Sequence, residues 1–156
     1  MASERTRQRI ARLVAPRLGP TEDIVATGPA WAAPLRRRVP VLLVGRKLHL
    51  VALTDRRLLV FRRRRRRQAG GDLALAKTLT SLRVVRVRSW RPMMALRLQI
   101  GDGRVLLLEL RPRDRALGRS IADAVRAASA AAANTATNAD TEAGDTDDAP
   151  ATENEP

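Results

Sequence analysis

The chain has 156 residues, of which 44% are hydrophobic but only 2% aromatic, and its 30 basic residues outnumber its 16 acidic residues for a net charge of +14. It has no cysteine, which excludes disulfides, thiolate metal sites and cysteine nucleophiles, and its single histidine disfavours histidine-based metal sites and acid–base networks. No apolar run approaches the ~20 residues of a membrane-spanning helix and no secretory signal begins the chain, so we expect a cytoplasmic, strongly basic and non-enzymatic protein.

The charge is unevenly distributed. Residues 134–156 hold seven acidic residues and no basic one, whereas residues 1–133 hold all 30 basic residues and nine acidic ones, a net charge of +21. The 134–156 segment has no large apolar side chain, so it cannot bury enough surface to offset the entropy lost on ordering. We therefore expect three parts: an N-terminal basic helix at 1–19, a folded domain at 20–133 and a disordered acidic tail at 134–156.

A short helix is predicted from Ser3 to about Val14. Ser3 is a suitable N-cap, and Pro16 ends the helical pattern. Ile10, Leu13 and Val14 share one face, and most of the rest of the helix surface is basic. Three apolar residues give little energy for membrane insertion, so we expect this face to dock on the folded domain.

From Ile24 onward the pattern changes to that of short strands. Val39–Val44 is apolar, but Pro40 confines it to an edge or an irregular segment. In the fifth strand Val85 and Val87 are expected to share a face. The clearest hairpin turns at 101–103, where Gly-Asp-Gly separates two alternating segments. The seven predicted strands cover 24–31, 48–53, 58–61, 73–79, 82–88, 94–100 and 106–110.

After Pro112 an amphipathic helix is predicted, capped near Asp114. Its apolar stripe fades at Ala130–Ala133 and consists of Leu117, Ile121, Val125 and Ala128. Strands and helices do not alternate as in parallel α/β folds. The sequence therefore predicts a mainly β (α+β) domain, a small antiparallel barrel or sandwich with a helix across one opening.

One segment resembles a known family. Residues 50–61, which read LVALTDRRLLVF, are similar to the second-to-third strand signature of bacterial pleckstrin-homology-like (PH/GRAM-like) domains. Residues 79–85 are similar to a later step of the same pattern, and the whole resemblance covers about 20–130. It implies a seven-stranded bent antiparallel sheet capped by a C-terminal helix, without enzymatic activity. It also implies that Arg56 and Arg57, at the turn between the second and third strands, stabilise that hairpin.

Resemblance to lipid-binding members of this fold directs attention to three loops at one open end of the sheet. These are the loops between strands one and two, three and four, and six and seven, and all three contain basic residues. Each basic residue near an anionic membrane contributes ~1 kcal/mol, so six in one loop suffice for reversible peripheral binding. The candidate anion- and lipid-binding residues are Arg36, Arg37, Arg38, Arg46, Lys47, Arg62, Arg63, Arg64, Arg65, Arg66, Arg67 and Arg104.

Two explanations of the arginine content stay open. Only Lys47 and Lys77 are lysine, and arginine is the better phosphate ligand because its guanidinium is forked and weakly hydrated. Richness in arginine and alanine also follows from the codon bias of a GC-rich genome, without selection for binding. This second explanation is weaker for Arg62–Arg67, because six consecutive like charges repel one another without a partner.

The preferred interpretation is a non-catalytic binding module that associates with anionic lipid headgroups at the inner face of the cell membrane, or with an acidic protein partner. The alternative is non-specific binding of nucleic acid, because a domain with a charge of +21 attracts phosphate backbones. A further hypothesis is that the acidic tail folds back on Arg62–Arg67 and competes with the anionic ligand. We expect no cofactor, metal or small-molecule substrate and no catalytic residue.

Five other residues have mainly structural interpretations. Trp31 and Trp90 are expected to fill core space, because the domain has so few aromatic side chains. His49 is expected to be a packed or surface residue. Glu22 and the adjacent Asp23 are interpreted as a turn before the first strand.

Overall fold

The computed structural model describes residues 4–36, 47–62, 72–89, 92–101 and 104–142. The described chain begins with helix α1 (Glu4–Val14) and ends with helix α2 (Arg115–Glu142). Short 3₁₀ helices occupy Ala15–Arg17, Leu79–Ser81 and Pro112–Asp114. The strands are β1 (Ile24–Arg36), β2 (Lys47–Thr54), β3 (Arg57–Arg62), β4 (Asp72–Thr78), β5 (Arg83–Ser89), β6 (Met94–Gly101) and β7 (Arg104–Leu110).

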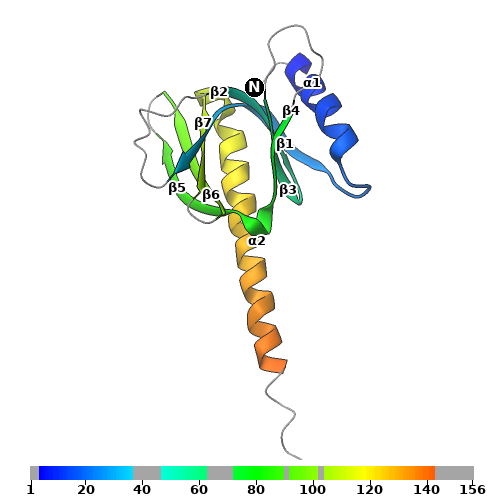
Figure 1. Cartoon of the computed structure of the whole chain (residues 1–156), viewed down its shortest axis with the longest axis vertical. Coiled ribbons are helices and arrows are strands. Elements are labelled where there is room, and N and C mark those ends of the chain that lie inside the picture. Colours follow the sequence, from blue (N-terminus) through cyan, green and yellow to red (C-terminus); the bar gives the residue numbers. More distant parts are fainter. Residues whose placement is uncertain (1–3, 37–46, 63–71, 90–91, 102–103, 143–156) are drawn as a thin grey trace, which may run out of the picture.

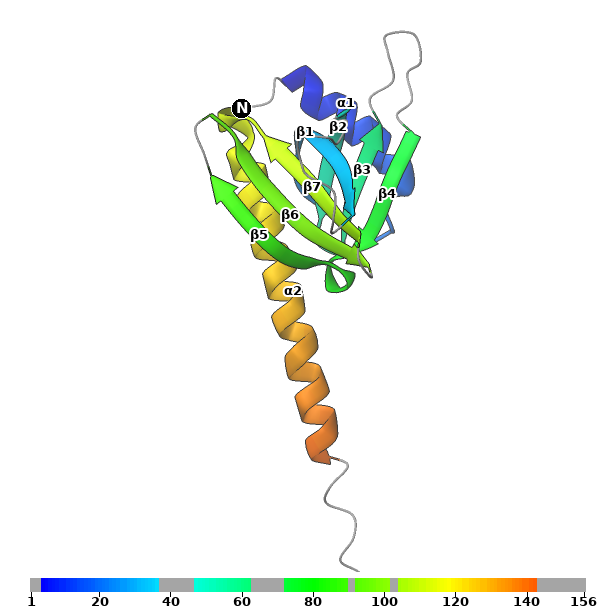
Figure 2. The ribbon, with the colours of Figure 1, turned by 60° about the vertical axis from the view of Figure 1, so that its left-hand side comes forward.

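The seven strands form one antiparallel sheet in the order β4-β3-β2-β1-β7-β6-β5. Strand β1 pairs with β2 over Ile24–Ala32 and with β7 over Trp31–Arg36, so this long strand joins the two halves of the sheet. The sheet bends around the first half of α2, and the second half of that helix projects away from it (Figures 1 and 2). This arrangement confirms the predicted fold class, a mainly β domain with a seven-stranded bent antiparallel sheet, a short N-terminal helix and a C-terminal helix.

The main core lies between the sheet and α2, on what we call the inner face. Alternate strand residues supply it, such as Leu96 and Leu98 on β6 and Leu108 on β7, and all three are fully buried. From α2 come Leu117, Ile121 and Val125, the predicted apolar stripe. Gly118 lets α2 approach the sheet closely, since a Cβ there would lie 2.9 Å from the Met94 sulfur and 3.1 Å from Leu110 Cδ1.

Helix α1 covers part of the opposite, outer face of the sheet. Ile10, Leu13 and Val14 are buried against β2 and β3, where they contact a second cluster that includes Leu59 and Phe61. The predicted docking of this helix is therefore confirmed. Both faces of the β2–β3 pair are consequently covered, which explains why the residues from 49 to 54 are all buried.

In β5 the prediction that Val85 and Val87 share a face is wrong. The register between β5 and β6 shifts between Val84 and Arg86, which marks a β-bulge. As a result Val84 and Val87 pack against the core, whereas Val85 is 54% exposed. A bulge inserts one extra residue and reverses the alternation beyond it, and the apolar pattern of the sequence does not reveal where that occurs.

The bulge predicts different effects of the same substitution at Val87 and at Val85. Val87→Thr should lower the free energy of unfolding by about 1 kcal/mol, because it places a hydroxyl against the core, whereas Val85→Thr should change it by less than about 0.5 kcal/mol. Urea denaturation of both variants measures the difference. Equal destabilisation by the two substitutions would contradict the bulge.

The C-terminal helix continues to Glu142, beyond the expected boundary at Ala133. Alanine has the highest helix propensity, so the run at 130–133 extends the helix instead of ending it. Thr135 also donates a hydrogen bond from Oγ1 to the Ala131 carbonyl at 3.0 Å. Residues 143–156 of the acidic tail and the Val39–Val44 segment lie outside the described residues. Among the helices that the structure describes, none is long and apolar enough to cross a lipid bilayer.

Candidate anion-binding site

Four of the predicted binding residues stand at strand ends that the sheet brings to one rim. Arg36 is the last residue of β1 and lies directly opposite Arg104, the first residue of β7. Lys47, the first residue of β2, lies opposite Ala32 on β1. Arg62, the last residue of β3, lies opposite His49 on β2. We call Arg36, Lys47, Arg62 and Arg104 the basic rim.

All four positions belong to the inner face of the sheet. Residues directly opposite each other in an antiparallel ladder share a face, and every second residue along a strand returns to it. Ala32, Val51, Val60 and Leu106 are core residues of the inner face, and the rim positions continue their rows beyond the core. The rim is therefore the cationic margin of the surface that holds the apolar core.

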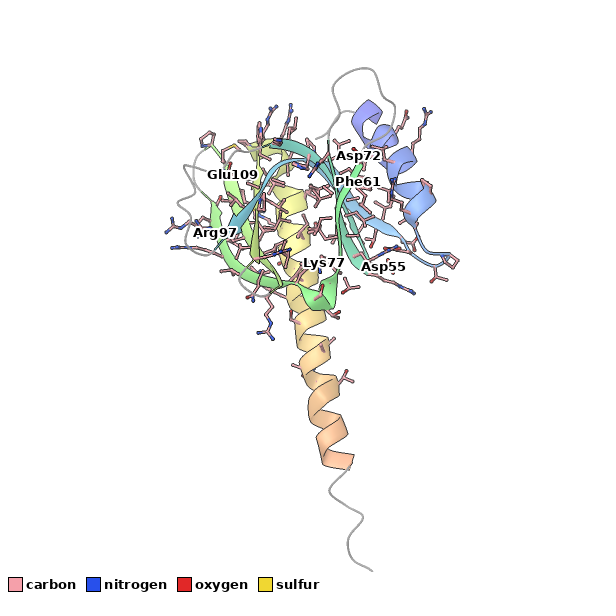
Figure 3. The ribbon with its side chains drawn as sticks, in the orientation of Figure 1. Asp55, Phe61, Asp72, Lys77, Arg97 and Glu109 are labelled. Carbon is pink, nitrogen blue, oxygen red and sulfur yellow. The ribbon has the colours of Figure 1, made fainter. Side chains whose placement is uncertain are left out.

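The described rim side chains are not held in ion pairs with other described residues. Lys47, Arg62 and Arg104 are exposed, and none forms an ion pair or side-chain hydrogen bond with another residue that the structure describes. Asp72, the first residue of β4, lies opposite Arg62 and is the acidic residue at this end of the β3–β4 pair. Figure 3 shows Asp72 at one end of this pair and Asp55 and Lys77 at the other.

The other predicted binding residues lie outside the described residues. They adjoin the rim residues in the sequence. Arg37 and Arg38 come after Arg36, Arg46 comes before Lys47, and Arg63–Arg67 come after Arg62. For Arg36 the structure describes the backbone and its register position, and not the side chain. Trp90 also lies outside the described residues.

His49 is a packed residue, one of the two placements expected for it. Its side chain lies on the inner face, buried next to Arg62, and its Nδ1 is 2.7 Å from the Lys47 carbonyl oxygen. Within the described residues, no three histidine or acidic side chains gather in a way that could hold a metal ion. Trp31 does not fill the core as expected. It is half-buried on the outer face, with the Arg111 guanidinium 4.7 Å from its ring centre.

A second polar cluster surrounds Glu22, at the turn between β2 and β3. The Glu22 carboxylate accepts hydrogen bonds from Arg57 Nε at 2.9 Å and from Arg57 Nη2, from Thr54 Oγ1 at 2.6 Å and from the Gly19 amide at 3.0 Å. The Arg57 hydrogen bonds are the largest cause that lowers the pKa of Glu22 from 4.5 to about 2. The same contact raises the pKa of Arg57.

This cluster is structural. Every acceptor position of the carboxylate is used by the protein itself, and the side chain is only 2% exposed. The cluster ties the segment before β1 to the β2–β3 hairpin, and a reciprocal pair of backbone and side-chain bonds between Asp23 and Asp55, each 3.1 Å long, reinforces the tie. The expected role of Arg57 in the hairpin is confirmed, and the Glu22 turn proves to be its anchor.

One basic surface was missed by reasoning from the sequence. Arg83, Arg86 and Arg88 on β5 are exposed, and Arg97 on β6 is half-buried beside them, all on the outer face. The sequence showed them only as isolated arginines in alternating segments. Their common face depends on the β5 bulge, which no residue type in the segment announces.

No protein-family model and no curated protein sequence matches the chain. Solved structures of the Vav1 exchange factor are similar to it at low identity, and the chain spans about a third or less of their length. One, on the structural role of the Vav1 PH and C1 domains, has 18% identity and a TM-score of 0.48, covering 81% of this chain and 33% of that chain. Vav1 inhibited by an allosteric inhibitor has 16% identity and a TM-score of 0.46, covering 81% of this chain and 34% of that chain. Autoinhibited Vav1 also has 16% identity and a TM-score of 0.46, covering 80% of this chain and 23% of that chain.

Proposed function

We propose that the chain is a non-catalytic binding module that attaches peripherally to an anionic membrane surface through the basic rim. The observation that carries the proposal is the convergence of cationic strand ends. Arg36 and Arg104 are direct partners in the ladder, and Lys47 and Arg62 continue the same inner-face rows on β2 and β3. Strands β1 and β7 lie far apart in the sequence, so Arg36 and Arg104 come opposite each other only because of the fold.

The electrostatics of the rim favour a surface over a single small anion. Lys47, Arg62 and Arg104 are exposed and project from three different strands, which spreads their charge along the rim. Spread charges attract an anionic lipid leaflet, where each basic residue contributes ~1 kcal/mol and the attraction falls off within a Debye length. The arginine run that continues from Arg62 adds charge at the same strand end.

Vesicle sedimentation of the full chain tests this proposal. The wild type should bind vesicles of phosphatidylserine and phosphatidylcholine at near-physiological salt, and should not bind vesicles of phosphatidylcholine alone. Replacing Lys47, Arg62 and Arg104 together with glutamine should weaken the first interaction by about a hundredfold, because three contributions of ~1 kcal/mol are lost.

A matched variant controls for net charge. Replacing the exposed Arg113, Arg119 and Arg126 with glutamine removes the same charge from α2 and the turn before it, away from the rim. This variant should keep most of the vesicle binding. The proposal would be overturned if both variants lost vesicle binding equally, or if the wild type bound both kinds of vesicle equally. An acidic protein partner would then be sought by pull-down.

A further inference from the structure

The outer face of strands β5 and β6 carries four arginines, Arg83, Arg86, Arg88 and Arg97, which we call the arginine face. The three on β5 are exposed and Arg97 is half-buried. None of the four forms an ion pair or side-chain hydrogen bond with another residue in the part of the chain that the structure describes. Figure 3 places Arg97 on the side of the sheet that β5 and β6 form.

The β5 bulge creates this face. In an unbroken strand Arg83 would point to the side opposite Arg86 and Arg88, because side chains alternate. The register shift between Val84 and Arg86 reverses the alternation, so that Arg83 pairs with Gln99, Arg86 with Arg97 and Arg88 with Ala95, all on the outer face. A bulge often re-aims side chains for a purpose.

The direct pairing of Arg86 with Arg97 is unfavourable in the isolated protein. Like charges directly opposite each other on neighbouring strands destabilise a sheet. Neither β5 nor β6 contains an acidic residue, and on the neighbouring strand β7 the outer face carries the buried Glu109, which lies opposite Ala95 and not opposite either member of this pair. An anion bound between the two guanidinium groups would remove the repulsion, and each group offers a fork of donors that matches a phosphate.

The spacing of the four groups fits a chain of anions. Arg86 and Arg88 are two residues apart, ~6.8 Å along the strand, and Arg97 lies about 5 Å across the ladder from Arg86. Such a row engages several charges of a linear polymer, whereas one small anion would fill only one pair. Strand β5 also lies at the end of the sheet order, so among the described strands none pairs with its other side.

We propose that the arginine face binds the phosphodiester backbone of a nucleic acid without reading its bases. Neither β5 nor β6 carries an aromatic side chain that could stack on a base, so contacts with the backbone alone are expected. The face is separate from the basic rim, which occupies inner-face positions. This inference therefore does not depend on the proposed membrane attachment.

Fluorescence anisotropy with a labelled DNA duplex tests it, using the full chain. In the variant with Arg83, Arg86, Arg88 and Arg97 replaced by glutamine, the slope of log affinity against log salt should become shallower by about 3 to 4, since each phosphate contact contributes about 0.9. The affinity at near-physiological salt should fall at least roughly tenfold. A control variant with Arg12, Arg113, Arg119 and Arg126 replaced by glutamine removes equal charge elsewhere and should lose much less.

Two further variants keep the test decisive. Arg86→Lys with Arg97→Lys retains charge but not the forked donors, so the salt slope should stay while the affinity falls several-fold. The rim variant of Lys47, Arg62 and Arg104 should lose vesicle binding but keep most duplex binding. Thermal unfolding of every variant confirms that it is folded, and Arg97→Gln should melt no lower than the wild type, because it removes a like-charge pair.

Each failure has a distinct signature. If the four-arginine variant and its charge-matched control bind the duplex equally, the inference is wrong, whatever the vesicles show. If the four-arginine variant loses vesicle binding but keeps duplex binding, the face serves a membrane and the inference is also overturned. Duplex binding that depends on the arginine face, together with vesicle binding absent from the wild type, would instead refute only the proposed membrane attachment.

Discussion

Replacing Glu22 with glutamine should lower the free energy of unfolding by about 2 to 3 kcal/mol at neutral pH, because a buried ion pair that loses one partner leaves the other uncompensated. Glutamine has one acceptor oxygen, whereas the carboxylate accepts four hydrogen bonds, two of them from Arg57. The Arg57 side chain is 32% exposed, so water partly compensates its loss and keeps the effect below that of a fully buried pair. Urea denaturation at pH 7 measures the difference.

The same substitution should also change how stability depends on pH. The pKa of Glu22 is lowered in the folded protein from 4.5 to about 2, so the unfolded chain binds a proton at higher pH than the folded one does. The stabilisation is therefore fully present above about pH 5 and is lost as the pH falls toward 2. The gap in stability between the wild type and Glu22→Gln should narrow to nearly nothing over this range.

An exposed carboxylate provides the control. Asp123 pairs with Arg126 at 3.2 Å one turn along α2, but both side chains are mostly exposed. Asp123→Asn should change the free energy of unfolding by less than about 0.5 kcal/mol, as exposed ion pairs contribute little. A gap between the wild type and Glu22→Gln that stays constant from pH 7 to pH 3 would show that the carboxylate charge is not what stabilises the turn.

Replacing Phe61 with alanine should destabilise the protein by about 3 to 4 kcal/mol and loosen helix α1. Phe61 is fully buried between β3 and α1, where its neighbours include Ile10 and Val14, and the Arg17 guanidinium lies 5.5 Å from its ring centre. Its removal opens a cavity under the small apolar face of α1, which consists of Ile10, Leu13 and Val14. Amide hydrogen exchange should therefore speed up in α1 more than in α2.

Val25→Ala is the matched control for this substitution. Val25 is 59% exposed on β1, so its truncation should cost less than about 0.5 kcal/mol and leave exchange in α1 unchanged. Unchanged protection of α1 in Phe61→Ala would mean that the helix does not depend on this contact. Its docking would then come from the rest of the cluster, which consists of Leu50, Ala52 and Leu59 with Leu18 and Ile24 packed against them.

Much of the fold is visible in local patterns. Alternating apolar residues in β6 and β7 predicted a hairpin, because every second residue of each strand belongs to the buried inner face. The stripe from Leu117 to Val125 predicted a helix packed against a sheet, because those residues share one side of the helix. The small apolar face of α1 predicted docking. The end of α2 was predicted less well, because the alanine run at 130–133 favours helix and extends it past the point where burial ends.

The candidate sites depended more on tertiary structure. The sequence identified arginines next to turns, but only the strand register brings Arg36 opposite Arg104 and gives Lys47 and Arg62 the same face. Glu22 gave no sign of its importance, because its partner Arg57 is distant in the sequence. The arginine face was invisible, because strict alternation along β5 divides its members between two faces.

The sequence by itself therefore determined which segments are strands and helices, where the apolar faces of α1, α2 and β6 lie, and that the domain is strongly basic. These properties depend on each segment's own side chains and on the two periods of regular backbone. Only the tertiary structure decided which charges meet at the rim, that Glu22 anchors the β2–β3 turn, and that a bulge turns Arg83, Arg86 and Arg88 to one side. Those outcomes depend on register between distant strands, and register is fixed by the packing of the whole sheet.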